Sequence, residues 1–403
     1  MKRRIFVAAI MTTAAVLGLF GTITPGIGTQ LGLAATQSSP WSQTDSNAAL
    51  SRANLTEKVL SRATVTKIKY LRSAVAPPNS SPCLQAGAVA LAGGYLYALT
   101  AGKISKYNAA TGRLIWRRTP DQSDGYEWLA VSHNLVIVGG AGCVSESEPS
   151  SIVYAFNAST GALVWSQRLS EVLLTEAAVS GSYVITYGPG PVSSTATVFK
   201  IADGTLVWSS PGCGGLASQV VVGSLVITYG CSPQGSRTLD ARNLATGAVA
   251  WSRPGNWGLQ RGDQSGANGK HLYATNPTGT VVDLNPLTGQ AKYSLSQAVT
   301  VLAVDSTRVY ATCGSQGQDL CGYNIGTGAL AWQDTQLLGT PKMAAEADGV
   351  LYLNYGAALN TATGKRITRI WPIDPPHTAL AVGDGRIVAV TGRITDLYGL
   401  QGY

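Results

Sequence analysis

The chain has 403 residues, and one packed core rarely grows beyond roughly 250–300 residues, so several domains or a modular architecture is expected. Its net charge of +8 is scattered without a run of four basic residues, which argues against nucleic-acid binding as the main role. The 47 glycines, the low charged content of 12% and the widespread valine, threonine, tyrosine and tryptophan indicate a β-rich, turn-rich protein.

Residues 1–35 predict a secretory signal peptide. Basic residues 2–4 precede an apolar stretch over residues 5–20, and the small residues Ala34 and Ala35 offer a cleavage point. The apolar stretch is shorter than the span of about 20 residues that a membrane requires, although an uncleaved anchor is the alternative. We therefore expect a secreted protein, extracellular or in the cell envelope, with no stable membrane span after signal cleavage.

Residues 36–62 form a polar segment between the signal peptide and the main domain. The stretch AALSRANLTEKVLSRA within it is compatible with a short helix, and we interpret the segment as a linker that tethers or straps the domain. The main domain covers residues 63–403 and begins with TVTKIKYLR (64–72), which predicts a β-strand outside any repeat.

A ten-residue pattern then recurs seven times, as in FNASTGALVW (156–165) and YNIGTGALAW (323–332). Each copy ends a unit of four short strands, and successive copies are 36 to 49 residues apart. This period is typical of a propeller blade, and the short β-rich runs with glycine turns exclude a helical solenoid of similar period. The turn glycines are Gly112, Gly161, Gly204, Gly247, Gly289, Gly328 and Gly364.

The C-terminal stretch ALAVGDGRIVAVTGRITDLYGL (379–400) supplies three strands of one more blade without its fourth strand. The strand at 64–72 can fill that place and seal the ring. Divided among eight blades, residues 63–403 give about 43 residues per blade. We therefore predict an all-β, eight-bladed β-propeller of four-stranded antiparallel blades. Seven blades is the alternative, and it leaves the terminal strands unexplained.

The pattern Ala-x-Asn-x-x-Thr-Gly-x-x-x-Trp resembles the tryptophan-docking repeat of the pyrroloquinoline-quinone-type (PQQ-like) propellers. That superfamily includes quinoprotein alcohol dehydrogenases and a non-enzymatic propeller of the outer-membrane assembly machinery. The resemblance covers about residues 63–403, and it is specific for fold rather than for function. The fullest matches are Ala155-Asn157-Thr160-Gly161-Trp165 and Ala241-Asn243-Thr246-Gly247-Trp251.

The repeated residues have clear structural roles. The glycine allows the positive φ of the turn, and the Asn-x-x-Thr side chains hydrogen-bond the local backbone. The tryptophan can cover the turn of the neighbouring blade while its N–H meets a backbone carbonyl. A series of sugar-binding aromatics is the alternative, although binding sites are usually asymmetric. The docking tryptophans are Trp116, Trp165, Trp208, Trp251 and Trp332, and Tyr293 and Thr368 depart from the pattern.

Six cysteines in an exported chain predict disulfides. One pair begins and ends two antiparallel strands of one blade, and a second pair flanks a single loop between strands. The third pair follows by elimination and would bridge adjacent blades. The expected disulfides are Cys213–Cys231, Cys313–Cys321 and Cys83–Cys143.

The longest and least regular loops connect one blade to the next or join the second and third strands of a blade. Two tryptophans near such loops are off the repeat register and lack the docking explanation. With their polar neighbours they are candidates for a ligand rim, and local packing over the channel mouth is the alternative. The candidate rim residues are Tyr126, Glu127, Trp128, Trp257, Arg261 and Asp263.

Enzymatic relatives use a calcium ion, carboxylate and amide ligands and often a disulfide between adjacent cysteines, whereas this chain has no adjacent cysteine pair and no evident calcium loop. CxxCH, GxSxG and HExxH are also absent. We therefore predict no catalytic residue, metal or cofactor, and expect a monomeric, non-catalytic module that binds a protein or cell-envelope ligand. A PQQ- and calcium-dependent oxidoreductase is the alternative, and a hydrolase or lyase of cell-wall glycans is a third possibility.

Overall fold

A computed structural model describes residues 40–75, 87–100, 102–120, 124–142, 151–171, 174, 176–189, 194–213, 219–262, 270–337, 339–371, 379–391 and 394–401. The chain divides into Met1–Thr36 and Gln37–Tyr403, and the second unit is the subject below. None of the helices in the described ranges has the length and apolar character needed to cross a membrane.

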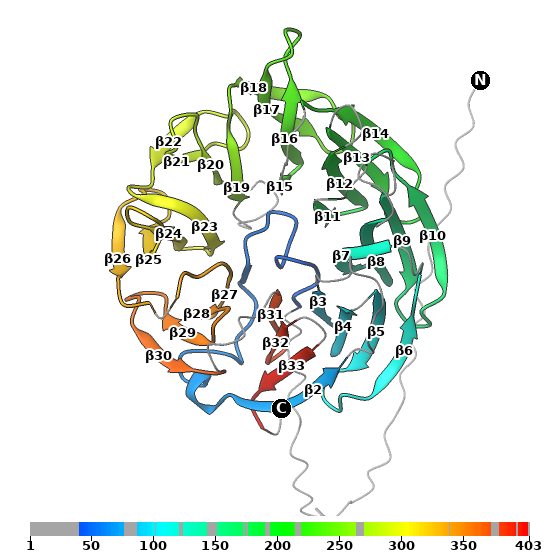
Figure 1. Cartoon of the computed structure of the whole chain (residues 1–403), viewed down its shortest axis with the longest axis vertical. Coiled ribbons are helices and arrows are strands. Elements are labelled where there is room, and N and C mark those ends of the chain that lie inside the picture. The colour runs from blue at the N-terminus through cyan, green and yellow to red at the C-terminus, as the bar shows by residue number, and fades with distance from the viewer. Residues whose placement is uncertain are drawn as a thin grey trace, which may run out of the picture. The chain divides into compact units, whose positions relative to one another are not determined.

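Eight β-sheets form the second unit, and Figure 1 shows them arranged as a ring of blades. Blades 1 and 2 are β3 (Ala88–Ala92), β4 (Tyr95–Thr100), β5 (Lys103–Asn108) and β6 (Leu114–Arg118), then β7 (Asp124–Ser132), β8 (Leu135–Gly142), β9 (Ser151–Asn157) and β10 (Leu163–Arg168). Blades 3 and 4 are β11 (Glu176–Ser180), β12 (Tyr183–Pro189), β13 (Ser194–Lys200) and β14 (Leu206–Pro211), then β15 (Val220–Val222), β16 (Leu225–Cys231), β17 (Arg237–Asn243) and β18 (Val249–Pro254).

The second half of the ring repeats this plan. Blades 5 and 6 are β19 (Gly258–Gly262), β20 (Leu272–Thr275), β21 (Val281–Leu284) and β22 (Ala291–Ser294), then β23 (Ala298–Val304), β24 (Arg308–Cys313), β25 (Asp319–Asn324) and β26 (Leu330–Asp334). Blade 7 is β27 (Ala344–Ala347), β28 (Val350–Leu353), β29 (Ala357–Asn360) and β30 (Arg366–Arg369), with β1 (Ala53–Asn54) added parallel to β27. Blade 8 is β31 (Ala379–Gly383), β32 (Arg386–Thr391), β33 (Ile394–Gly399) and the N-terminal β2 (Lys69–Val75).

The pairing of β2 with β33 closes the ring and confirms the eight-bladed prediction. The two strands run antiparallel, with Tyr70 opposite Tyr398 and Val75 opposite Ile394. The closing strand starts five residues later than the sequence predicted. Residues Val65–Lys67 form the 3-10 helix η1, which buries Val65 before the strand begins at Lys69.

The turn between the third and fourth strands of a blade explains why asparagine, threonine and glycine recur in the repeat. In blade 2 the Asn157 side-chain oxygen accepts the N–H of Thr160 at 3.0 Å, and the Asn157 carbonyl accepts the N–H of Gly161 at 2.7 Å. Gly161 has a φ of 71°, which glycine adopts without steric cost. The register then shifts between Leu163 and Trp165, so the tryptophan turns inward after two exposed apolar residues.

Candidate functional site

The repeated tryptophans join each blade to the next one along the chain. Trp165 of blade 2 donates its Nε1–H to the Ile201 carbonyl at 2.9 Å, and its ring lies against Gly204 of blade 3. A Cβ added to Gly204 would meet the ring at 2.8 Å, so a glycine is needed there for space as well as for its φ. The same bond runs from Trp116 to Ala158, from Trp208 to Leu244, from Trp251 to Pro286 and from Trp332 to Thr361.

At two other joints, a side chain other than tryptophan covers the turn glycine of the neighbouring blade. Tyr293 packs against Gly328, and its hydroxyl accepts the N–H of Gly326 at 3.0 Å. Arg72, on the closing strand β2, covers Gly112 and donates to the Ala110 carbonyl at 2.8 Å. Together with the tryptophans, these contacts form an outer belt, which we define as the seven turn glycines and the side chains that cover them.

Thr368 departs from the pattern for a topological reason. It lies on β30 of blade 7, and its neighbour, blade 8, takes its outermost strands β33 and β2 from opposite ends of the chain. Those two strands are joined by no turn, so blade 8 offers no turn glycine for a tryptophan to cover. The threonine that replaces the tryptophan at position 368 therefore marks the joint beside the blade that closes the ring.

The cysteines that lie in the described ranges are paired. Cys213 bonds Cys231 in blade 4, and Cys313 bonds Cys321 in blade 6, as the sequence predicted. Cys83 and Cys143 fall outside the described residues, so the third expected disulfide stays a prediction.

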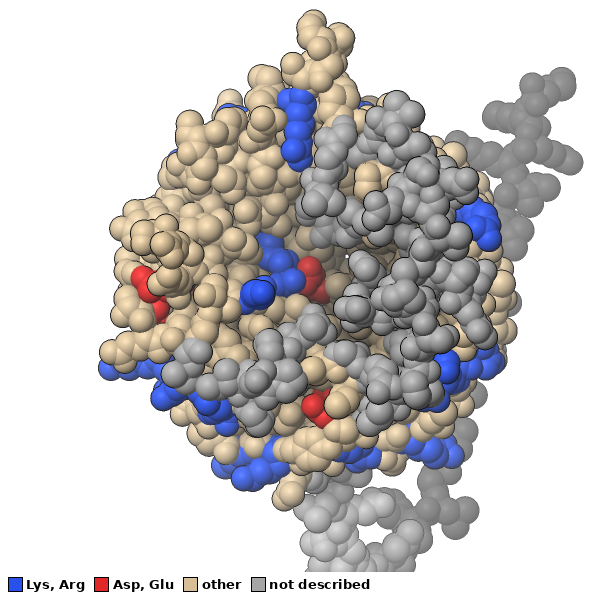
Figure 2. Space-filling view, in the orientation of Figure 1, with Lys and Arg blue, Asp and Glu red and all other residues tan. Residues whose placement is uncertain are grey.

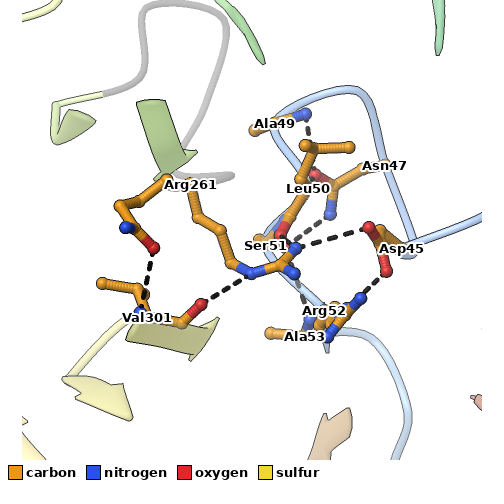
Figure 3. Close-up of polar contacts among 10 residues, drawn as sticks. Asp45, Asn47, Ala49, Leu50, Ser51, Arg52, Ala53, Arg261 and Val301 are labelled. Carbon is orange, nitrogen blue, oxygen red and sulfur yellow. Dashed lines mark hydrogen bonds and ion pairs between the residues drawn. The ribbon is translucent and has the colours of Figure 1, made fainter. Parts of the chain in front are cut away.

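The predicted ligand rim divides into a buried part and a part near the axis of the ring. Trp128 and Trp257 are 5% and 6% exposed and pack in separate core clusters, so neither ring is offered at the surface. Burial fits the local-packing alternative for these two residues. The side chains of Tyr126 and Glu127, and all of Asp263, lie outside the described residues. Arg261 points to the axis, where it meets residues that the sequence analysis did not single out (Figure 3).

Residues 41–54 occupy the axis of the ring, and we call them the axial segment. Figure 1 shows this part of the chain looping within the centre, inside the first strands of the blades. The sequence suggested a linker or short helix over residues 36–62; over 40–62 the only regular element is the two-residue strand β1. The repeat analysis missed the segment because it contains no repeated motif.

The axial segment hydrogen-bonds the innermost strand of all eight blades in chain order. Six of these contacts use its backbone and two use an amide side chain. Trp41 O accepts from Leu91, Ser42 O from Val131, Ala48 O from Val221, Ala49 O from Gly262, Ser51 O from Val304 and Arg52 O from Glu346, at 2.7–2.9 Å. Gln43 bonds both backbone groups of Val179 in blade 3, and Asn54 Nδ2 donates to Val382 in blade 8 at 2.8 Å.

A charged group fixes the axial segment to blade 5. Arg261 donates to the Leu50 carbonyl at 2.6 Å and to the Val301 carbonyl at 3.0 Å, and its Nη1 lies 3.4 Å from Asp45 Oδ2 (Figure 3). Arg52 pairs with the other oxygen of Asp45. Figure 2 shows basic and acidic side chains meeting at the centre of this face.

The electrostatics of this group favour the ionised carboxylate. Burial raises the pKa of the Asp45 carboxyl, but the charges and hydrogen bonds of Arg52 and Arg261 outweigh burial and lower the pKa below its usual value. The three side chains are only 12–17% exposed, so the ion pairs are weakly screened by water. The positive charge of Arg261 at the axis is therefore matched by the carboxylate of Asp45.

Trp41 and Glu57 hold the two ends of the segment in place. Trp41 is 1% exposed and packs in the core cluster that includes Leu91 and Leu380. Glu57, just after the segment, is fully buried and accepts backbone N–H groups from Val59 at 2.7 Å and from Gly385 of blade 8 at 3.0 Å.

The described residues do not fit a calcium-bound quinone on the axis. A ligand that draws side chains from many blades must lie where the blades converge, and the axial segment fills that place. Within the described ranges, no three His, Cys, Asp or Glu side chains lie close enough together to hold a metal ion.

Comparisons with known proteins agree with this fold. The family described as outer membrane protein assembly factor BamB matches residues 42–145, 130–256 and 235–396. No curated protein matches the chain. Among solved structures, BamB from Moraxella catarrhalis is 19% identical, over 83% of this chain and 98% of that chain, with a TM-score of 0.60. A quinohemoprotein alcohol dehydrogenase from Pseudomonas putida is 13% identical, over 91% of this chain and 81% of that chain, with a TM-score of 0.68. The computationally designed Ika8 protein is 16% identical, over 77% of this chain and 95% of that chain, with a TM-score of 0.59.

Proposed function

The chain belongs to the PQQ-like propeller family described as outer membrane protein assembly factor BamB, and from that premise we propose that it is a non-catalytic binding or scaffold module. Its partner is a protein of the cell envelope, and the predicted signal peptide at residues 1–35 delivers it there. The family description names an assembly factor, which is a role that needs binding surfaces and no reaction centre.

The observation that carries this proposal is the filled axis. Eight converging innermost strands are the part of a propeller best placed to build an active site, and here each strand bonds the axial segment instead. At the axis, Asp45 is paired with both Arg261 and Arg52. This arrangement suits a rigid display scaffold better than a cofactor-dependent oxidoreductase.

In vivo photo-crosslinking tests the proposal in a cell that exports the chain. A photoreactive amino acid is placed at exposed positions such as Leu163, Leu206 and Leu330, and at the buried Leu351 as a negative control. The proposal expects discrete crosslinks to one envelope protein from a contiguous set of exposed positions. A uniform or absent pattern at every exposed position of the ring would contradict it.

A second experiment tests the oxidoreductase alternative directly. Purified protein is mixed with pyrroloquinoline quinone and calcium, and quinone absorbance and alcohol- or sugar-dependent dye reduction are followed. The proposal expects no spectral change and no turnover. Substrate-dependent dye reduction that requires both quinone and calcium would overturn the non-catalytic assignment.

A further inference from the structure

We propose that the joint between blades 1 and 2 holds a binding site for a small organic carboxylate, with Lys106 as its cationic partner. The site lies on the face of the ring that carries the turns between first and second strands and between third and fourth strands. It goes beyond the proposed binding of an envelope protein and does not depend on it. The inference follows from a buried lysine that no acidic group in the described part of the chain neutralises.

Lys106 departs from the repeat at a position that is uncharged in six blades. This position lies directly opposite the docking tryptophan, or the side chain that takes its place, on the neighbouring strand. The uncharged residues there are Ala155, Val198, Ala241, Gly322, Ala358 and Leu397. Charged residues occupy it in blade 1, as Lys106 opposite Trp116, and in blade 5, as Asp283 opposite Tyr293.

The two exceptions differ in how their charge is matched. In blade 5, on the opposite side of the ring (Figure 1), the Asp283 carboxylate lies 2.7 Å from His271 Nδ1 and 3.7 Å from Lys292 Nζ. In blade 1, Lys106 is 6% exposed, and its ammonium donates to the Ala158 carbonyl at 2.9 Å. Among the described residues this ammonium has no carboxylate partner. A buried charge without a counter-charge is unfavourable, so the site favours an anion that supplies one.

Aromatic rings flank the ammonium of Lys106. Its Nζ lies 3.8 Å from the centroid of the Tyr95 ring and 5.4 Å from that of Tyr97. Such rings attract a cation through their quadrupole, but they carry no net charge to neutralise it. Burial lowers the pKa of the Lys106 amine, and no acidic group of the described chain opposes that shift. A bound carboxylate would oppose it and hold the amine in its charged form.

Lys106 lines a cavity that is large enough for one small molecule. The volume of the cavity is about 420 Å³, which is within the range of ligand pockets. Apolar and aromatic side chains of both blades form much of its wall, and two side chains in turns of blade 2 add polar groups. The apolar and aromatic residues include Tyr95, Tyr97, Ile115 and Val131, and the polar ones are Asn134 and Ser159. A carboxylate with an apolar body matches this wall, because its anion pairs with the lysine while its body covers the apolar side chains.

The test is a titration followed by fluorine NMR, with para-fluorobenzoate as the probe and full-length protein as the receptor. The alcohol para-fluorobenzyl alcohol is the neutral analogue, and inorganic phosphate is an anion without an apolar body. Because a hydrogen bond to a charged group is stronger than a neutral one, we expect wild type to bind the benzoate about tenfold more tightly than the alcohol. Phosphate at the same concentration should not displace the benzoate.

Two substitutions of the lysine and one matched control locate the binding. Lys106→Met keeps the length of the side chain without its charge, and Lys106→Ala restores the residue that blades 2, 4 and 7 carry at this position. Each should weaken benzoate binding about tenfold, and Lys106→Met should leave binding of the alcohol unchanged. Lys103→Met removes an equal charge from the same strand outside the cavity, and it should bind the benzoate as wild type does.

Circular dichroism and thermal unfolding establish that each variant is folded. If one Lys106 variant does not fold, the other decides, together with the preference of wild type for the benzoate over the alcohol. Equal benzoate binding by wild type and a folded Lys106 variant would overturn the site, as would absent binding or equal affinity for acid and alcohol. Displacement by phosphate would contradict the role of the apolar wall. No envelope partner enters this experiment, so its failure leaves the crosslinking result and the proposed function unaffected.

Discussion

The outer belt and the axial segment both join the blades, but they do so by opposite means. In the belt, one contact is repeated: a tryptophan on one blade covers a glycine turn on the next, as Trp165 covers Gly204. At the axis, one aperiodic stretch contacts each blade through a different residue, from Trp41 in blade 1 to Asn54 in blade 8. A belt contact stabilises one joint, whereas the axial segment couples all of the joints.

The comparison teaches where to look for function in a repeat protein. Residues that recur serve the repeat, and the belt uses them as scaffold. Residues that occur once are free to specialise, and the axis collects them. Substitutions in either region, or directly beside it, show whether the response stays local or spreads around the ring.

The largest expected effect is on the belt. Trp165→Ala removes a buried ring and its bond to Ile201, and we expect the free energy of unfolding to fall by roughly 3–5 kcal/mol. Trp165→Phe keeps most of the packing and should cost about 1 kcal/mol through the lost hydrogen bond. Chemical denaturation of both variants measures the difference. Equal losses would mean that the ring packing contributes little.

The turn glycines should respond according to their neighbours. Gly247→Ala meets a positive φ of 72° and the Trp208 ring 2.8 Å from the new Cβ, so we expect a loss of roughly 2–4 kcal/mol. Gly181→Ala is the matched control, because it has a φ of 55° with nothing within 4 Å, and should cost only about 1–2 kcal/mol. Thermal unfolding of the two variants tests whether the belt contact, and not the backbone alone, requires glycine.

The carboxyl of Glu346, a residue bonded to the axial segment, should make the stability of the protein depend on pH. Burial, with Asp305 nearby, raises the pKa of its carboxyl from 4.5 to about 8. A carboxyl with a raised pKa binds a proton in the folded state that the unfolded state has released, so its contribution to stability falls as pH rises from about 4.5 to 8. Glu346→Gln removes this titration, while its side-chain oxygen can still accept the N–H of Gly349.

We expect the variant to gain roughly 1–4 kcal/mol over wild type at pH 8, and much less at pH 5. Denaturation at both pH values measures the gap. A gap that does not widen with pH would show that the carboxyl titrates near its ordinary value in the folded protein.

The sequence predicted what repeats and missed what does not. The glycine turns, the tryptophan positions, the blade count and the closing strand all follow from periodicity. Arg72 was not predictable as a substitute for tryptophan, because only the closed ring brings β2 beside Gly112. The axial segment was not predictable for a similar reason, because its eight contacts join residues far apart in the sequence. Polar residues such as Gln43 and Asn54 are typical of a linker, and only the closed ring gives them partners. Arg261 was singled out, but its partner Asp45 was not.

The most direct test of the account is amide hydrogen exchange in wild type, Asp45→Asn and Asp203→Asn. Asp203 lies in a belt turn, so its replacement removes an equal charge away from the axis. The account predicts that Asp45→Asn speeds exchange of the Val221, Gly262, Val304 and Glu346 amides together by about tenfold, equivalent to about 1.4 kcal/mol, while Asp203→Asn leaves them unchanged. If only the amides of blade 5 respond, or if none does, the axial segment does not couple the eight blades and the central claim fails.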